Sequence, residues 1–220
     1  MGIERPVTII GGHGKIALRA ARLLTDSGAE VNSVIRNPDH EADVRATGAT
    51  PVVADIETLD VDGLREVLRG SGSVLFSAGA GGGSPQRTYA VDRDAAIRTI
   101  DACVAEGIGR YVMVSYQGAR EDHGVPEDNS FFPYAESKAA ADSHLRGSGL
   151  DWTILGPGKL TEEPGRGSIG IGDQMREDRA TSRDEVAAVA AAVLHRPDTV
   201  NRTIEFTDGE TPIGEGLTRD

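Results

Sequence analysis

The sequence VTIIGGHGKIALRAARLL, at residues 7–24, decides the fold of this protein. Four apolar residues run into a glycine cluster, and the chain leaves that cluster directly as a helix-forming segment. Gly11 and Gly14 are three residues apart, and Ala17 follows after three more. Such a turn lets backbone N–H groups and a helix N-terminus approach a pyrophosphate without side chains in the way. We assign the tight turn to Gly11, the close approach of phosphate to Gly14, and helix–strand packing to Ala17.

Predicted strands and helices alternate along the rest of the chain. The strands are expected at residues 7–10, 30–35, 50–54, 73–77, 110–114, 151–155 and 203–206, and the helices at residues 15–27, 39–46, 61–68, 89–106, 133–146 and 183–194. Gly28 suits the position after the first helix, Asp60 suits a helix N-cap, and Pro133 suits a first helical turn. Because the connections are short, we predict a parallel, doubly wound sheet with helices on both faces. The fold class is α/β, a single Rossmann domain over residues 1–220.

Composition excludes several classes of protein. No apolar stretch approaches the roughly 20 residues that span a bilayer, and the first residues lack the pattern of a signal peptide. We therefore expect a cytoplasmic protein without a membrane partner. The formal net charge of -12 argues against a nucleic-acid partner, since phosphate binding favours a basic surface. The single cysteine, Cys103, falls in a helical pattern and is expected to be a buried, inert thiol. The five histidines show no metal-ligand spacing, so no metal site is predicted.

Glycines and polar residues follow the predicted strands, at the sheet edge where ligands bind in such folds. Two longer connections also stand out. Residues 79–87 are glycine-rich, and they are either a flexible part of the site or a surface excursion. Residues 117–132 are charged and then aromatic, and a connection of that length is often a functional lid.

The residue after the second strand indicates which dinucleotide binds. A site for NAD usually places a carboxylate there, whereas this chain has Arg36. A guanidinium binds a 2′-phosphate bidentately, so NADP(H) is preferred and NAD(H) is the alternative. His13 and Lys15 in the glycine turn are candidates for adding positive charge near the same phosphate. Asp55, with Ile56 after it, is placed either to meet the adenine amino group or to cap a turn.

The segment FFPYAESKAAAD carries the candidate chemistry. Tyr134 and Lys138 are four residues apart on a predicted helix and so share a face. A neighbouring ammonium favours the phenolate and lowers the pKa of a tyrosine, which suits it to proton exchange. Ser115, at the end of the fifth strand, is placed to donate to a substrate carbonyl. Alternatively, Tyr134 packs at the helix start and Lys138 is a surface lysine.

These motifs together resemble the atypical short-chain dehydrogenase/reductase family, in its small NAD(P)H-binding branch with biliverdin reductase B-like and NmrA-like proteins. The matching segments are GGHGKIA, VIRN, ADI, FSAGA, YVMVS, YAESKAAAD and WTILGPGKL. The resemblance implies that Ser115, Tyr134 and Lys138 are the catalytic residues. It implies cofactor contacts from Gly11, Gly12, His13, Gly14, Lys15, Ile16, Arg36, Asp55, Ile56, Ala78, Gly79, Ala80, Pro157, Gly158, Lys159 and Leu160, with the last four beside the nicotinamide.

The chain also departs from the family pattern. Ala17 replaces the third glycine, Tyr116 replaces the second residue of a Ser-Ser pair, and Arg98 stands where the family has an asparagine. The region after the sixth strand is short, so a sugar-nucleotide epimerase is not expected. The function predicted is oxidoreduction of a small carbonyl, alcohol or flavin/quinone-like substrate, by a monomer or homodimer. The alternative is a non-catalytic redox sensor of the NmrA-like type.

Overall fold

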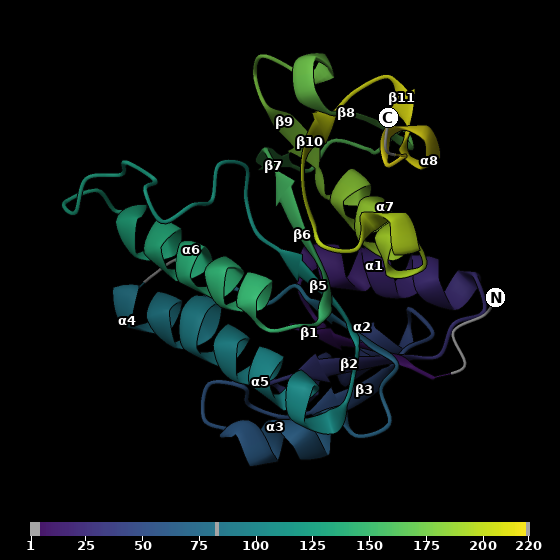
Figure 1. Ribbon diagram of the computed structural model, residues 1–220. Coiled ribbons are helices and arrows are strands. Elements are labelled where there is room, and N and C mark those ends of the chain that lie inside the picture. Colours follow the sequence, from purple (N-terminus) through teal and green to yellow (C-terminus); the bar gives the residue numbers. More distant parts are fainter. Residues whose placement is uncertain (1–4, 82–83, 219–220) are drawn as a thin grey trace.

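A mostly parallel sheet forms the centre of the computed structural model, which describes residues 5–81 and 84–218 (Figure 1). Nine strands pair in the order β11-β8-β10-β6-β5-β4-β1-β2-β3. Every pairing from β3 across to β10 is parallel, and β8 is antiparallel to both β10 and β11. The bounds are β1 (Val7–Ile10), β2 (Val31–Ile35), β3 (Thr50–Val53), β4 (Ser73–Phe76), β5 (Arg110–Val114), β6 (Asp151–Pro157), β8 (Ser168–Gly170), β10 (Arg202–Asp208) and β11 (Thr211–Pro212).

Helices cover both faces of the sheet, as the alternating pattern predicts. One face carries α1 (Lys15–Asp26) and α7 (Arg183–Leu194), which pack against each other (Figure 1). The other carries α3 (Val61–Leu68), α5 (Ala96–Glu106) and α6 (Phe132–Gly147). Shorter helices are α2 (Glu41–Arg45), α4 (Pro85–Thr88), α8 (Ile213–Gly216) and the 3-10 turns Pro38–His40, Gly172–Gln174 and Pro197–Thr199. The predicted α/β Rossmann fold is confirmed.

Two apolar clusters hold these layers together, one on each face of the sheet. The central strands are buried on both sides, and their sequences read accordingly as short continuous apolar runs. Cys103 is fully buried in the second cluster, and burial raises the pKa of its thiol, as expected for an inert cysteine. Ala187 and Ala190 of α7 are buried in the first cluster, so these two side chains pack against residues of this chain.

Local signals predicted several element ends correctly. Asp60 caps α3, because its carboxylate accepts the N–H of Gly63 at 2.8 Å. Gly28 follows α1 with φ +89°, the left-handed conformation that glycine adopts at little cost. Pro133 lies in the first turn of α6.

Three parts of the fold differ from the prediction. The long helix expected at residues 89–106 begins as α4 and contains a π-helical stretch, Tyr89–Ala95, before α5. A small parallel pair, β7 (Lys159–Thr161) with β9 (Ala180–Ser182), lies beside the main sheet. The strands β8 and β11 are also additional. All four extra strands are two or three residues long, too short to show an alternating pattern.

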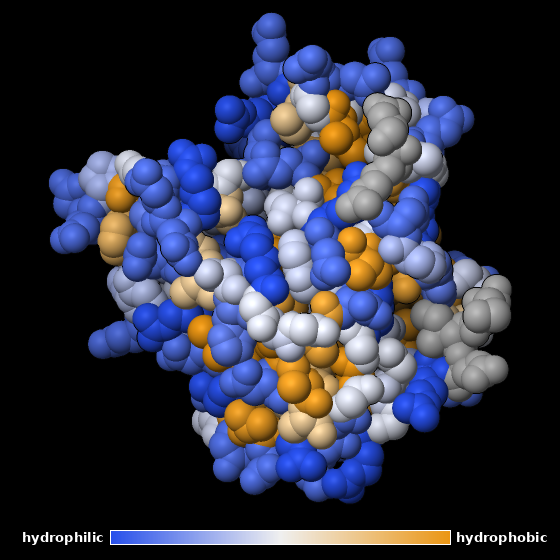
Figure 2. Space-filling view, in the orientation of Figure 1, coloured by the Kyte–Doolittle hydropathy of each residue, from blue (hydrophilic) through white to orange (hydrophobic). Residues whose placement is uncertain are grey.

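The surface seen in Figure 2 is largely hydrophilic, and its apolar residues lie in small separate groups. No helix within the described residues is both long and apolar enough to cross a membrane.

Candidate functional site

The strand order reverses between β1 and β4, and the glycine turn lies at this switch point. Gly11 has φ +83°, and a Cβ there would lie 2.6 Å from the Cα of Ala78, which follows β4. Only glycine lets the two loops approach this closely. The N–H of Gly14 donates to the Gly11 carbonyl at 2.9 Å, closing the turn before α1. The first turn of α1 has neither a side-chain cap nor an acidic residue, so no side chain competes with an anion for its N–H groups.

A first cavity of about 340 Å³, here called the nucleotide pocket, opens beside this turn. It is framed by the ends of β1, β2, β3 and β4 and by α4. Its lining includes Gly11, His13, Gly14, Arg36, Asn37, His40, Asp55, Ile56, Glu57, Ala78, Gly79 and Arg87. The structure therefore brings together most of the residues predicted to hold the adenosine half of a cofactor.

Arg36 is not free in this pocket. Its Nη1 donates to Oε1 of Glu57 at 2.5 Å, and Nη2 of Arg87 donates to the same oxygen at 2.8 Å. The hydrogen bond from Arg87 lowers the pKa of Glu57, and the charge of Arg36 adds to this effect. Sequence reasoning missed Glu57 and Arg87, because neither has a local motif and both are far from Arg36 along the chain.

Asp55 lines the nucleotide pocket and also caps its own turn. Its Oδ1 accepts the N–H of Glu57 at 3.0 Å. Arg98, the departure from the family pattern, braces the same loop from α5. Its guanidinium donates to three backbone carbonyls, those of Ile56, Glu57 and Leu59, at 2.9 to 3.3 Å. The side chain that replaces an asparagine therefore fixes the loop after β3.

A second cavity of about 780 Å³, here called the large cavity, continues from the first across Ser77, Ala78 and Gly79. One wall is the end of the 117–132 connection, and Leu160 of β7 lines another part. In Figure 2 the surface is indented between the arm projecting at left and the upper lobe. The lining includes Ile16, Gly79, Ala80, Thr88, Asp92, Ser115, Glu127, Asn129, Phe131, Tyr134, Lys138 and Leu160. Of the predicted 79–87 loop, residues 82 and 83 lie outside the described residues.

Ser115, Tyr134 and Lys138 all line the large cavity, as the motif predicts. Tyr134 belongs to an aromatic group with Tyr116 and Phe131, with ring centroids 5.3 to 5.5 Å apart. The expected lowering of the Tyr134 pKa is wrong. Burial raises the pKa of this phenol, and the nearby carboxylates of Asp92 and Asp142 raise it further. A phenol in this state holds its proton at neutral pH.

Lys138 is 1% exposed, so the alternative of a surface lysine is wrong. Its Nζ lies 3.8 Å from Sδ of Met113 and 5.9 Å from the centroid of the Phe76 ring. These are weak partners for a buried ammonium, which has three N–H donors. The residue therefore has donor capacity left for a bound ligand.

Ser115 also has a partner inside the protein. Its hydroxyl donates to Oδ2 of Asp142 at 2.6 Å, so its proton is engaged in this hydrogen bond. Asp142 is fully buried in α6, and burial raises its pKa against the opposing effects of Lys138 and this hydrogen bond. Asp142 was missed, although it follows Lys138 by four residues and Tyr134 by eight, a spacing that places all three on one helix face.

Asp92 is a second buried carboxylate at the large cavity. The π-helical stretch places Oδ2 of Asp92 2.9 Å from the backbone nitrogen of Ala80, and this hydrogen bond supports the glycine-rich loop after β4. Burial raises its pKa, while the ammonium of Lys138 acts in the opposite direction. Single π-helical turns often occur at functional sites, and here the turn serves to aim a carboxylate at the loop.

Five predicted cofactor residues in the described part of the chain are absent from the linings of both cavities: Gly12, Lys15, Pro157, Gly158 and Lys159. Gly12 packs against Ser33, and a Cβ there would lie 2.6 Å from the Cβ of that serine. Pro157 is buried in β6, and a Cβ on Gly158 would collide with the carbonyl oxygen of Arg179. Lys15 donates instead to Glu162, directly after β7.

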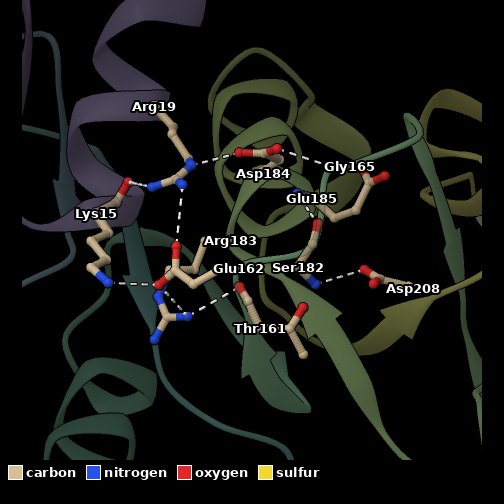
Figure 3. Close-up of polar contacts among 10 residues, drawn as sticks. All are labelled: Lys15, Arg19, Thr161, Glu162, Gly165, Ser182, Arg183, Asp184, Glu185 and Asp208. Atoms are coloured by element: carbon tan, nitrogen blue, oxygen red, sulfur yellow. Dashed lines mark hydrogen bonds and ion pairs between the residues drawn. The ribbon is translucent and has the colours of Figure 1, made fainter.

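Lys15 joins a network that ties α1 to β7 and α7 (Figure 3). Glu162 accepts from Lys15 at 2.7 Å, and it also pairs with Arg19 and Arg183. Arg19 reaches Asp184 at 2.5 Å. Deeper in the same region, the buried carboxylate of Glu185 accepts backbone N–H groups of residues 166 to 168. The network holds the strand that carries Leu160 beside the start of α1.

Comparison with known proteins agrees with this geometry. The model of the NAD(P)H-binding family matches residues 11–197. This chain belongs to the NAD(P)H-binding family. It is an atypical short-chain dehydrogenase/reductase, and the match covers both the glycine turn and the Tyr134–Lys138 helix.

Relatives in this family are similar over nearly their whole length. The sugar epimerase YhfK of Bacillus subtilis, itself described as uncharacterized, is 34% identical over 213 residues, 96% of this chain and 98% of that protein. A structure from Bacillus halodurans, provisionally named an NAD-dependent epimerase/dehydratase, has a TM-score of 0.87 at 30% identity and covers 97% of this chain and 98% of its own. The reductase ChuY of Escherichia coli O157:H7 has a TM-score of 0.75 at 24% identity, covering 92% and 97%, which is a likeness of fold.

Proposed function

We propose that this protein is an NADP(H)-dependent reductase of small carbonyl or flavin/quinone-like substrates. The observation that carries the proposal is that Tyr134 and the buried Lys138 face the same cavity as the glycine-rich loop after β4. A dinucleotide that lies across the two connected cavities would pass between the glycine turn and that loop. The residues fit such a ligand, because the α1 N-terminus is uncapped and Lys138 has donor capacity left.

The bound cofactor supplies a hydride for the substrate carbon. Tyr134 then acts as the general acid, giving its phenolic proton to the carbonyl oxygen so that an alcohol forms. The phenol is protonated at neutral pH, so it holds the proton that reduction needs. The ammonium of Lys138 stabilises the phenolate left behind, and solvent returns the proton.

The apolar and aromatic residues that line the large cavity support the proposed class of substrate. Phe131 and Leu160, which are 42% and 37% exposed, both line the cavity and offer apolar surface to a ligand. The rings of Phe131 and Tyr134, which both line the cavity, offer faces on which a flat conjugated substrate can stack. The preference for NADP(H) rests on Arg36, the guanidinium at the end of β2.

A titration followed by a turnover assay tests the proposal. The purified protein is titrated with NADPH and NADH by fluorescence, beside Arg36→Ala and Arg36→Asp. Micromolar binding of NADPH that weakens in both variants supports the cofactor choice, and equal, Arg36-independent binding of NADH contradicts it. Consumption of NADPH with a panel of quinones, flavins and aldehydes then tests reduction.

Two other results would point elsewhere. Tight NADPH binding with no turnover on any of these substrates would favour the non-catalytic sensor of the NmrA-like type. The bond from Ser115 to Asp142 gives that alternative some support, because the serine proton is engaged by the carboxylate. Absence of binding by folded protein would contradict the proposal altogether.

A further inference from the structure

The nucleotide pocket contains a charge triad made of Arg36, Glu57 and Arg87. The three side chains come from three separate elements: the end of β2, the loop after β3, and α4. One carboxylate oxygen of Glu57 accepts from both guanidiniums, at 2.5 and 2.8 Å. All three residues line the pocket. A bound nucleotide would therefore meet the carboxylate together with the two arginines.

We propose that Glu57 and Arg87, together with Arg36, set the choice between NADP(H) and NAD(H). Arg87 is a second ligand for a 2′-phosphate, and Glu57 is a built-in competitor for the two arginines. The inference rests on the proposed function, because it assumes that this pocket takes the adenosine half of the cofactor.

NADP(H) and NAD(H) differ only at the 2′ position of the adenosine ribose, which carries a phosphate in one and a hydroxyl in the other. The triad would interact differently with these two groups. A 2′-phosphate carries close to two negative charges and forms charge-assisted bonds with guanidiniums. It must take the arginines from Glu57 and then lie beside that carboxylate, and a like-charge contact costs affinity. A 2′-hydroxyl can donate to Glu57 while both arginine bonds remain. Glu57 thus favours NAD(H), and the two arginines favour NADP(H).

The position of Glu57 is held by the loop rather than by the triad alone. Its N–H donates to Asp55 at 3.0 Å, and its carbonyl accepts from Arg98 at 3.3 Å. The Glu57 side chain is also only 20% exposed, whereas those of Arg36 and Arg87 are 54% and 44% exposed. The carboxylate therefore stays at the pocket while the arginines remain free to turn toward a ligand.

Fragments of the cofactor isolate this site from the rest of the molecule. Calorimetric titration at fixed low salt would compare 2′,5′-ADP with 5′-AMP, which differ only in the 2′-phosphate. We expect Glu57→Gln to bind 2′,5′-ADP about tenfold more tightly, a difference of about 1.4 kcal/mol, while 5′-AMP changes little. We expect Arg87→Gln to weaken 2′,5′-ADP by about tenfold and leave 5′-AMP unchanged.

Glu66 of α3 and Arg69, directly after that helix, form a similar ion pair outside both cavities. This pair provides the matched controls. Glu66→Gln and Arg69→Gln should bind both fragments as the parent does. Equal affinities for 2′,5′-ADP in the parent, Glu57→Gln and Arg87→Gln would overturn the inference. If the parent still binds and oxidises NADPH in that case, the proposed function stands without it. If folded parent protein binds no dinucleotide, both fail.

Discussion

The hydroxyl of Ser115 donates its hydrogen bond to the buried carboxylate of Asp142, with 2.6 Å between the two oxygens. Ser115 lines the large cavity with Tyr134 and Lys138, whereas Asp142 is buried behind it on α6, the helix that also carries Tyr134 and Lys138. An ionised Asp142 can only accept, so Ser115 presents lone pairs and not a proton to a substrate. A protonated Asp142 can donate to Ser115, which then has its own proton free for a carbonyl.

This relationship predicts a pH dependence of reduction. Burial raises the pKa of Asp142, so its protonated form persists above the usual range of about 4. In the parent, kcat/KM for a carbonyl substrate should fall as the pH rises through that pKa, by about tenfold. In Asp142→Asn the amide donates to Ser115 at every pH, so this fall should disappear. Steady-state rates from pH 4 to 8 check it, and an unchanged profile would argue against the coupling.

The same carboxyl predicts a pH dependence of stability. Between its ordinary pKa and its raised one, the folded protein binds a proton that the unfolded chain has lost. The contribution of Asp142 to the free energy of unfolding therefore decreases as the pH rises through this window. Denaturant unfolding of the parent and Asp142→Asn at several pH values should show the parent losing stability relative to the variant. A difference that does not vary with pH would contradict this assignment.

Tyr134→Phe tests the general acid. The change removes one hydroxyl from a site where the ring packs with Phe131 and Tyr116, so the fold should persist. We expect kcat to fall about 100-fold or more, because the proton donor is lost. NADPH affinity should stay within about threefold, since the phenol donates no proton in binding. Tyr116→Phe is the control, and turnover that persists in Tyr134→Phe would remove Tyr134 from the mechanism.

Gly11→Ala tests the close approach of the two loops. The left-handed backbone alone costs an alanine about 1 kcal/mol, and here the new Cβ would also meet the backbone of Ala78. We expect a loss of more than about 2 kcal/mol in stability and a strong loss of NADPH affinity. Gly28→Ala is matched, because Gly28 has φ +89° with nothing within 4 Å of its Cβ. That variant should lose only about 1 kcal/mol and bind NADPH as the parent does.

Arg98→Met tests the brace on the loop after β3. Three hydrogen bonds to the carbonyls of Ile56, Glu57 and Leu59 are removed, while the apolar stem of the side chain is kept. We expect both NADPH and NADH to weaken, by about tenfold, because the loop that carries Asp55, Ile56 and Glu57 at the nucleotide pocket loses its brace. Titration of both cofactors checks this, and affinities equal to those of the parent would show that the loop does not need the brace.

Much of the sheet was predictable from the sequence because its strands are buried on both faces. Residues 7–10 and 110–114 were predicted with the bounds that the structure has, and so was the helix Val61–Leu68 with its Asp60 cap. Each depends on interactions within a few residues: an apolar run, a helical period or a side chain bonded to the next turn. The Tyr134–Lys138 pair was predictable for the same reason, since helical spacing sets which residues share a face.

The polar partners of those residues were decided only by the tertiary structure. Ser115 and Asp142 are 27 residues apart, Arg36 and Glu57 are 21 apart, and Glu57 and Arg87 are 30 apart. No local pattern specifies which carboxylate meets which donor, because that depends on how strands and loops lie side by side at the edge of the sheet. Burial acts in the same way. It raised the pKa of Tyr134, where the neighbouring lysine alone predicted the opposite, because desolvation depends on the whole packed environment.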